Sequence, residues 1–399
     1  MDRRNFLALV GKSSQYLVAS SFLGACGRSP HVPPPIPIPT NPQSNLANIG
    51  LLQTADANGI RLPSGFSSRI IATSGDVPVL GSDYTWHSSP DGGAVFDTDD
   101  GWIYVSNSEL SGTSGGVGAL RFNATGELTD AYPILTGTYN NCAGGATPWN
   151  TWLSCEEYKN GLVWECDPTG RDLAVAHPAL GRFNHEAVAI DPETSQLYLT
   201  EDQPDGRWYR FTADSVDANG RADLSSGTLE VAKSDEGIVT WLLVPDPSGN
   251  TRPTRHQVPD STSFNGGEGT SYCDGFLYFT TKGDNRVWAY QIASSTLSVV
   301  YDAATAPSPI LTGVDNLEVS TFGDLLVAED GGDMQIIVIT PTGDILPLLQ
   351  VAGHYLSEVT GPAFSPDSSR LYFSSQRGPL GLASGGMTYE ISGPFTLES

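Results

Sequence analysis

The residues of this sequence best suited to chemistry are acidic side chains scattered along its length. Each of these acids stands at the end of a short apolar run, beside glycine or proline, and such runs recur about every fifty residues. Carboxylates that converge from the ends of strands repel one another strongly unless cations hold them together. We therefore predict a metal site built from Glu156, Glu157, Glu186, Glu268, Asp315, Asn316 and Glu358.

Two motifs indicate which metals these residues would hold. Asp315-Asn316 offers carboxylate and amide oxygens, the hard ligands that calcium prefers, although the same pair also forms an Asx-turn that merely begins a strand. Cys142, in a glycine-rich turn, is either a buried structural cysteine or a soft thiolate ligand for iron. The sequence contains no C-x-x-C or H-E-x-x-H spacing, so zinc-finger and zincin interpretations lack support.

A repeated phrase indicates the elements that would position these residues. Each copy is a turn, then alternating apolar residues, then small polar or acidic ones, as at 100–107 and 323–330. The copies centre on residues 103, 153, 198, 278, 326 and 372, at intervals of 50, 45, 80, 48 and 46. Several short strands per interval are typical of propeller blades, which we prefer over a pair of all-β sandwiches. We predict an all-β, six-bladed β-propeller with few helices and a long insertion at about 203–262.

Asn160-Gly161 predicts a two-residue type I′ hairpin turn. That turn would place Glu156 opposite Glu165 and Cys155 opposite Cys166. Opposed glutamates are destabilising unless a cation or a donor lies between them. The opposed cysteines could close a disulfide outside the cytoplasm, and the sequence leaves open whether they do.

The first 26 residues read as an export signal. Arg3 and Arg4 match a twin-arginine motif, and Leu-Gly-Ala-Cys at 23–26 matches the site where bacterial lipoproteins are cut and acylated. The alternative is a plain signal peptide with an accidental cysteine. We expect lipidation of Cys26, a Pro-rich tether at 27–58 and a single propeller domain at 59–399. The protein would then be a lipoprotein of the periplasm or cell envelope, exported by the twin-arginine pathway.

The charge of the chain limits its partners. The formal net charge of −25 disfavours nucleic acid and anionic lipid, whereas it suits a protein that binds cations. We expect no nucleic-acid partner, membrane contact only through the N-terminal lipid anchor, and a monomer.

The run Asn-Cys-Ala-Gly-Gly at 141–145, followed by Thr-Trp-Leu-Ser-Cys-Glu-Glu at 151–157, resembles the PhoX-type bacterial alkaline phosphatase family. Further matching motifs lie at 90–92, 105–109, 181–186, 315–316 and 358–362. Characterised members are six-bladed propellers whose axial channel holds iron and calcium, with a cysteine thiolate on the iron. The resemblance implies that Cys142 is this iron ligand and that Glu186 and Glu268 bind iron or calcium. It also implies further ligands at Glu358 and at one or both of Glu156 and Glu157, and hydrolysis of small phosphoric esters.

One position departs from the family pattern. The phosphatases carry an arginine two residues before the glutamate that matches Glu268, and here that position is Gly266. A bidentate contact to phosphate is therefore missing. Arg255, Lys282 or Arg286 could supply the charge instead, and a preference for diesters or an unusual ester stays open.

Two other functions agree with the same acidic residues. One is a calcium-dependent hydrolase resembling the gluconolactonases, which also use Asn, Asp and Glu at strand ends. The other is a non-catalytic binding propeller whose acids hold a structural cation. Cleavage of phosphate esters or of lactones, and dependence of the metal content on Cys142, would distinguish these alternatives.

Overall fold

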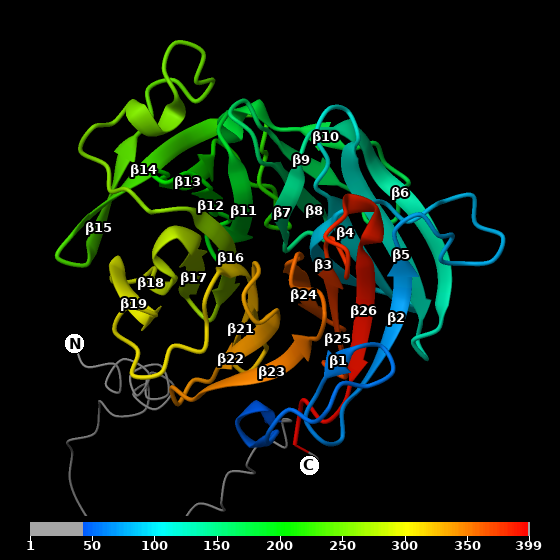
Figure 1. Ribbon diagram of the computed structural model, residues 1–399. Helices are drawn as coiled ribbons and strands as arrows, with labels where there is room; N and C mark the ends of the chain where they lie inside the picture. The colour runs from blue at the N-terminus through cyan, green and yellow to red at the C-terminus, as the bar shows by residue number, and fades with distance from the viewer. Residues whose placement is uncertain (1–42, 398–399) are drawn as a thin grey trace, which may run out of the picture.

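The computed structural model describes residues 43–397, which consist almost wholly of β-strands and turns (Figure 1). The predicted signal with Cys26, and residues 27–42 of the predicted tether, lie outside this range. The helices in the described range are short 3₁₀ turns: η2 (Leu46–Asn48), η3 (Pro178–Leu180), η4 (Thr254–His256), η5 (Lys282–Asp284) and η6 (Ala383–Gly385). None of the described helices has the length and apolar character needed to cross a membrane.

Within the described residues the main strands form five antiparallel sheets, three of which have four strands. The first contains β3 (Pro90–Thr98), β4 (Gly101–Ser108), β5 (Gly115–Asn123) and β6 (Leu128–Thr138). The second contains β7 (Asn141–Ala146), β8 (Trp152–Glu156), β9 (Val163–Cys166) and β10 (Val175–Ala176). The third contains β24 (Val359–Phe364), β25 (Arg370–Ser375), β26 (Met387–Ser392) and, at its outer edge, β2 (Ser67–Thr73).

The other two sheets are larger. The five-stranded sheet contains β20 (Val314–Val319), β21 (Leu325–Glu329), β22 (Gln335–Ile339), β23 (Ile345–Val351) and β1 (Ile60–Arg61). One part of the nine-stranded sheet is β11 (His185–Ile190), β12 (Leu197–Glu201), β13 (Trp208–Ala213), β14 (Gly227–Asp235) and β15 (Ile238–Leu243). Its other part is β16 (Gly267–Cys273), β17 (Phe276–Thr281), β18 (Arg286–Gln291) and β19 (Thr296–Asp302).

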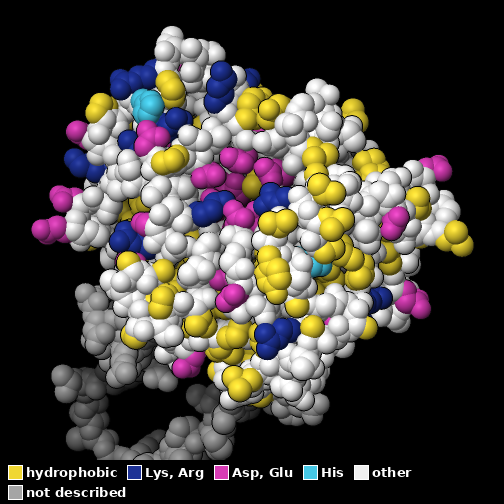
Figure 2. All heavy atoms as spheres, viewed as in Figure 1, with side chains coloured by type: hydrophobic (Ala, Val, Ile, Leu, Met, Phe, Trp, Pro, Cys, Tyr) yellow, Lys and Arg dark blue, Asp and Glu magenta, His cyan; other side chains and the backbone are white. Residues whose placement is uncertain are grey.

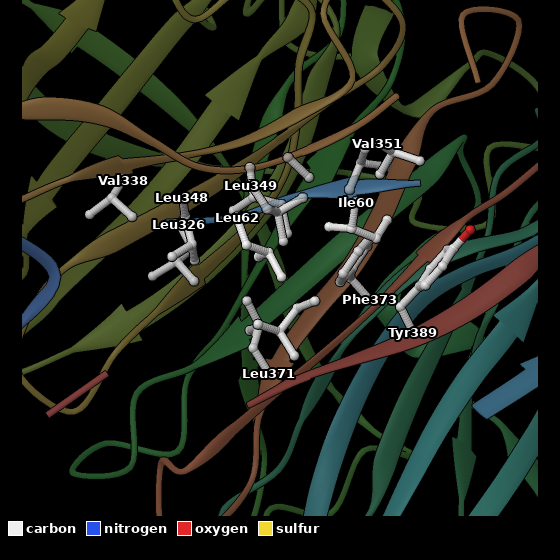
Figure 3. Close-up of a cluster of buried hydrophobic side chains, with 14 of the residues drawn as sticks. Ile60, Leu62, Leu326, Val338, Leu348, Leu349, Val351, Leu371, Phe373 and Tyr389 are labelled. Carbon is white, nitrogen blue, oxygen red and sulfur yellow. The ribbon is translucent and has the colours of Figure 1, made fainter. Parts of the chain in front are cut away.

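The sequence of β21 shows why the repeated apolar segments form strands whose two faces pack against different neighbouring sheets. Successive side chains of a strand point to opposite faces. Leu326 therefore belongs to the buried cluster on one face, which also contains Phe373 of β25 (Figure 3), while Leu325 belongs to a different cluster, which contains Tyr301. Because Leu326 is fully buried, its replacement by alanine would cost about 2–5 kcal/mol of stability.

Six strands form the inner wall of the molecule: β3, β7, β11, β16, β20 and β24. Each contacts the next in this order, and β24 contacts β3, so the ring closes. Figure 1 shows the sheets arranged around this common centre. The two N-terminal strands add to the outer edges of the last two sheets, because β1 pairs with β23 and β2 pairs with β26.

The all-β prediction and the propeller-like arrangement are confirmed, but the sheets do not count as six separate blades. β15 pairs with β19 through Ile238 and Thr296, which joins two groups of strands into the nine-stranded sheet. The segment 203–262, predicted as an insertion, contains β13, β14, β15 and η4.

The predicted Asn160-Gly161 hairpin is wrong. β8 and β9 pair with Cys155 opposite Val163, so the register differs by three residues from the predicted one. The loop between β8 and β9 is longer than the predicted two-residue turn. Within it Gly161 N donates to Tyr158 O, and Glu156 N donates to Leu162 O across it. Cys155 and Cys166 are free and pack in different hydrophobic clusters, so the disulfide that the sequence left open is absent from the structure.

Candidate metal centre

The six inner strands share a backbone irregularity near one end. Their pairing is interrupted between residues 90 and 93, 141 and 144, 185 and 188, 267 and 270, 314 and 317, and 360 and 363. A bulge of this kind changes the direction of the side chain within it. The first residues inside these interruptions are Asp91, Cys142, Glu186, Glu268, Asp315 and Gly361. Five of the six are ligand types, and Glu358 directly precedes the sixth strand, β24.

A second set of side chains comes from the neighbouring strands of the same sheets. It consists of the residue that directly follows β4, β8, β12, β17, β21 and β25. These residues are Glu109, Glu157, Asp202, Lys282, Asp330 and Gln376. In an antiparallel pair, the end of one strand lies beside the beginning of its neighbour. The residues that follow the second strands therefore lie at the same end of the ring as the bulges near the beginning of the inner strands.

The acids of both sets converge. The ligand atoms lie within 4.8 Å of one another in each of four groups: Asp91, Glu109 and Cys142; Cys142, Glu157 and Glu186; Glu186, Glu268 and Asp315; Asp315, Asp330 and Glu358. Neighbouring groups share Cys142, Glu186 or Asp315, so together they form one continuous centre. Figure 2 looks onto it and shows acidic side chains gathered in the middle of the face, with Lys and Arg side chains beside them.

The inner strands approach closely at this level, which explains the small residues there. A Cβ added to Gly92 would lie 2.5 Å from Ala143 Cα, and one added to Gly361 would lie 2.7 Å from Asp91 O. Gly361 also has a φ of +59°, which favours glycine. The sequence predicted a turn at Cys142, but this residue lies in the bulge of β7, which Asn107 holds in place because its Nδ2 donates to Cys142 O at 3.1 Å and to Ala143 O at 2.7 Å.

Burial and mutual repulsion dominate the electrostatics of the centre. Burial raises the pKa values of Asp91, Glu186, Glu268 and Glu358 well above their usual range, and neighbouring carboxylates raise them further. Burial likewise raises the pKa of Glu157 to about 8 and that of Asp315 to about 7. These acids cannot all ionise together unless positive charge enters the site.

Two basic side chains supply part of that charge. Lys282 Nζ lies 3.0 Å from Glu268 Oε1 and 3.3 Å from Asp330 Oδ2. Arg377 lies 3.0 Å from Glu358 Oε2 and 3.8 Å from Asp330 Oδ1. Burial raises the pKa of Asp330, but Lys282, Glu358 and Arg377 together outweigh that effect, so the net pKa is lowered.

Two buried carboxylate oxygens of the centre remain without a full set of hydrogen bonds despite the nearby Lys282 and Arg377. Glu186 Oε1 has no hydrogen-bond partner among the described residues. Glu268 Oε1 forms an ion pair with Lys282 but lacks a well-directed hydrogen bond. Buried acceptors without donors are costly, and cations relieve that cost. The donor set, one thiol among many carboxylates, therefore fits bound metal ions.

The sequence left open whether Glu156 or Glu157 points inward. Glu157 belongs to the converging groups. Glu156 instead accepts hydrogen bonds from the backbone N–H groups of Tyr139 at 3.0 Å and Leu162 at 3.1 Å. Asn316 braces the centre, since its Nδ2 donates to Asp315 Oδ1 and its Oδ1 accepts from Gly361 N.

Of the three candidate phosphate-binding residues, the structure brings only Lys282 to the centre. Arg255 instead pairs with Glu201 at 3.2 Å and Asp205 at 2.9 Å. Arg286 pairs with Asp284 and Asp302 and lies over the ring of Trp288.

Sequence reasoning did not select five residues that the structure places in or beside the centre: Asp91, Glu109, Asp202, Asp330 and Arg377. A signal for three of them was present, because Asp202 and Asp330 end copies of the repeated strand phrase and Glu109 lies two residues after another copy. Asp91 lies in a bulge and Arg377 in a loop, and neither position has a periodic signature.

Fold and site together define an all-β, propeller-like protein with an acidic, thiol-containing centre on its axis. Residues 103–378 match the family described as alkaline phosphatase PhoX. This match covers more than half of the chain, so the chain belongs to the PhoX family.

Solved structures support the fold. The chain is similar to Pseudomonas fluorescens PhoX in complex with vanadate, a transition state analogue, at 17% identity and a TM-score of 0.69, covering 86% of this chain and 97% of that one. It is also similar to a gluconolactonase from Xanthomonas campestris, at 14% identity and a TM-score of 0.51, covering 87% and 98%. A search of curated proteins gave no match.

Proposed function

We propose that this chain is a metal-dependent phosphoric ester hydrolase with iron and calcium at its axial centre. One observation carries the proposal: four overlapping groups of acids and a thiol meet beside Lys282 and Arg377. Membership of the PhoX family supports it. The likeness to a PhoX structure in complex with vanadate, a transition state analogue, also agrees with phosphoryl chemistry on this fold.

The donor chemistry distinguishes two parts of the centre. Cys142 with Asp91, Glu157 and Glu186 would hold iron, because a thiolate is a soft ligand. Glu268, Asp315, Asp330 and Glu358 offer only hard oxygens and would hold calcium. When bound, these cations supply Lewis acidity toward the oxygens of a phosphate ester.

Lys282 and Arg377 would bind the anionic oxygens of the ester and orient it for attack by water. A Cβ on Gly266 would lie 3.7 Å from Lys282 Cβ and 3.2 Å from Asp202 Oδ1. Lys282 therefore runs beside the position from which an arginine at 266 would start. We assign to Lys282 the charge that Gly266 cannot supply, rather than to Arg255 or Arg286.

Purified full-length protein tests this proposal through its metal content and its substrate range. We expect bound iron and calcium, cleavage of p-nitrophenyl phosphate or its diester, and no turnover of gluconolactone. The Cys142→Ala variant should lose iron and ester cleavage together. Lactone turnover that survives this substitution would support the gluconolactonase alternative, and a fully metal-loaded protein inactive on both ester classes would support a binding propeller.

The proposal extends to location and architecture. We propose export by the twin-arginine pathway, lipidation at Cys26 and a monomer. We also propose that β11–β14 and β16–β19 are two blades of a six-bladed propeller, because β15 joins them through a single residue pair. Cell fractionation of Cys26→Ser and of Arg3→Lys/Arg4→Lys variants tests the location. Release of the first variant from the membrane and retention of the second in the cytoplasm are expected, whereas unchanged fractionation contradicts the prediction.

A further inference from the structure

Two loops beside the metal centre expose large apolar side chains. Tyr355 and Leu356, in the loop before β24, are 67% and 70% exposed. Leu380 and Leu382, in the loop between β25 and β26, are 71% and 54% exposed. Figure 2 shows hydrophobic side chains on the face of the molecule beside the acidic cluster. We call these four residues the apolar rim.

The apolar rim is continuous with the site, because its loops carry two residues of the centre. Glu358 follows Tyr355 and Leu356 in one loop, and Arg377 is the second residue of the other. Arg377 N donates to Ser357 Oγ at 2.8 Å, and Leu382 N donates to Arg377 O at 3.0 Å. A Cβ on Gly381 would lie 2.6 Å from Leu356 Cβ, so the two loops are in contact. The apolar rim is therefore held in a fixed position relative to the Arg377 guanidinium.

An exposed apolar group that borders a polar site usually marks a place where a ligand binds. A phosphate ester held by Arg377 and Lys282 has its charged end at the centre. Its alcohol portion must then extend away from the acids, which repel polar anions but not apolar groups. On the side of Arg377 it meets the apolar rim.

We propose that the apolar rim binds the alcohol portion of the substrate, so that the enzyme prefers dissolved phosphate esters with an alkyl or aryl leaving group. This inference rests on the proposed function. In the reaction, water adds to phosphorus, the bond between phosphorus and the ester oxygen breaks, and the alcohol leaves with one proton. Phosphate is released, and no oxidant or reductant takes part.

A series of n-alkyl phosphates from ethyl to octyl, all below their micelle concentrations, tests the inference with metal-loaded full-length protein. Full burial of a methylene changes affinity about fourfold, so partial burial on an open surface should raise kcat/KM about twofold per methylene. The Leu380→Ser/Leu382→Ser variant keeps Tyr355 and Leu356, so it should weaken this dependence and lose about tenfold of the roughly 64-fold gain between ethyl and octyl phosphate. Its activity on glycerol phosphate should change less than about twofold.

Leu173→Ser is the matched control, since Leu173 is 93% exposed and lies between β9 and β10, at the opposite end of the strands. This control should keep the wild-type dependence on chain length. A flat dependence in the wild-type protein, or a dependence that the double variant retains at full wild-type strength, would overturn the inference while leaving the hydrolase proposal intact. Loss of binding to phosphatidylglycerol vesicles with an unchanged dependence would instead assign the rim to the membrane. If no ester is cleaved by metal-loaded protein, the proposed function itself fails.

Discussion

Glu165 and Glu186 are both buried glutamates, yet their surroundings are opposite. Glu165 Oε1 accepts hydrogen bonds from Trp149 Nε1 and Thr151 Oγ1, each at 2.8 Å, and its Oε2 lies 3.0 Å from His177 Nε2. Burial raises the pKa of Glu165, but these donors and Arg221 outweigh it and bring the value down to about 2. Its charge is therefore stabilised by the protein alone.

Glu186 lacks such donors. Its Oε1 is unpaired within the described chain, and burial together with Glu268 and Asp315 raises its pKa well above the usual range. The comparison teaches that burial alone does not separate a structural acid from a functional one. The two kinds of acid differ in the number of hydrogen-bond donors that the protein supplies to each carboxylate. At the axial centre the donors are too few to stabilise the ionised acids, so bound cations are needed.

The largest expected effect on activity comes from substituting Glu186, with the same substitution at Glu165 as its control. Glu186→Gln should lower metal content and reduce kcat/KM for a phosphate ester at least about 100-fold, because even residues that only orient metal ligands cost 10–100-fold. Glu165→Gln should keep metal content and activity. Elemental analysis and steady-state kinetics on both variants check this. Equal losses would remove the distinction between the two environments.

A smaller effect is expected from the basic residues. Lys282→Met should raise KM and lower kcat/KM about 10–100-fold, since it removes a charge-assisted contact to the anionic substrate. Arg286→Met, which removes a cation paired with Asp284 and Asp302, should change kcat/KM less than about twofold. Metal content is measured for both, so that a loss of cations is not mistaken for a loss of substrate binding.

The Glu165 cluster should govern acid stability. A folded-state pKa of about 2 lies below the unfolded value of about 4.3. The cluster therefore stabilises the protein above that unfolded value, and this contribution disappears as the pH falls toward 2. Urea unfolding should show Glu165→Gln to be less stable by roughly 1–3 kcal/mol at pH 6, with the difference shrinking in acid. A difference that grows in acid would contradict this assignment.

The smallest expected effect concerns Glu390, which is another acid with several donors. Arg69 and Arg370 each lie 2.7 Å from its carboxylate, and Tyr372 OH donates to it at 3.0 Å. Because Arg69 is 44% exposed and the other donors remain, Arg69→Ala should cost no more than about 1 kcal/mol. Thermal unfolding measures this. A loss of several kcal/mol would mean that donors in these clusters do not compensate for one another.

The loop between β8 and β9 differs from the hairpin turn that the sequence predicted. Glu165 and Glu156 were predicted to face each other across a hairpin, and neither does so. The backbone of Glu157 leaves the expected path, since Glu157 N donates to Asn140 O and Glu157 bridges to Asn184. Both contacts join segments that are separate in sequence, and a local turn rule contains no information about them.

The sequence alone determined the alternating strands, the repeat of about fifty residues, and the thiol and acids that stand beside its short apolar runs. These features are local, because strand periodicity and turn chemistry depend on neighbouring residues. They predicted the propeller-like fold and an acidic metal site, and the resemblance to the PhoX family implied that Cys142, Glu186 and Glu268 are ligands in it.

Only the tertiary structure decided which side chains meet. The bulges aim Asp91 and Asp315 inward, the extended loop selects Glu157 over Glu156, and the ion pairs withdraw Arg255 and Arg286 from the site. The reason is physical: the direction of a side chain at a bulge and the partner of a charge depend on contacts between distant segments.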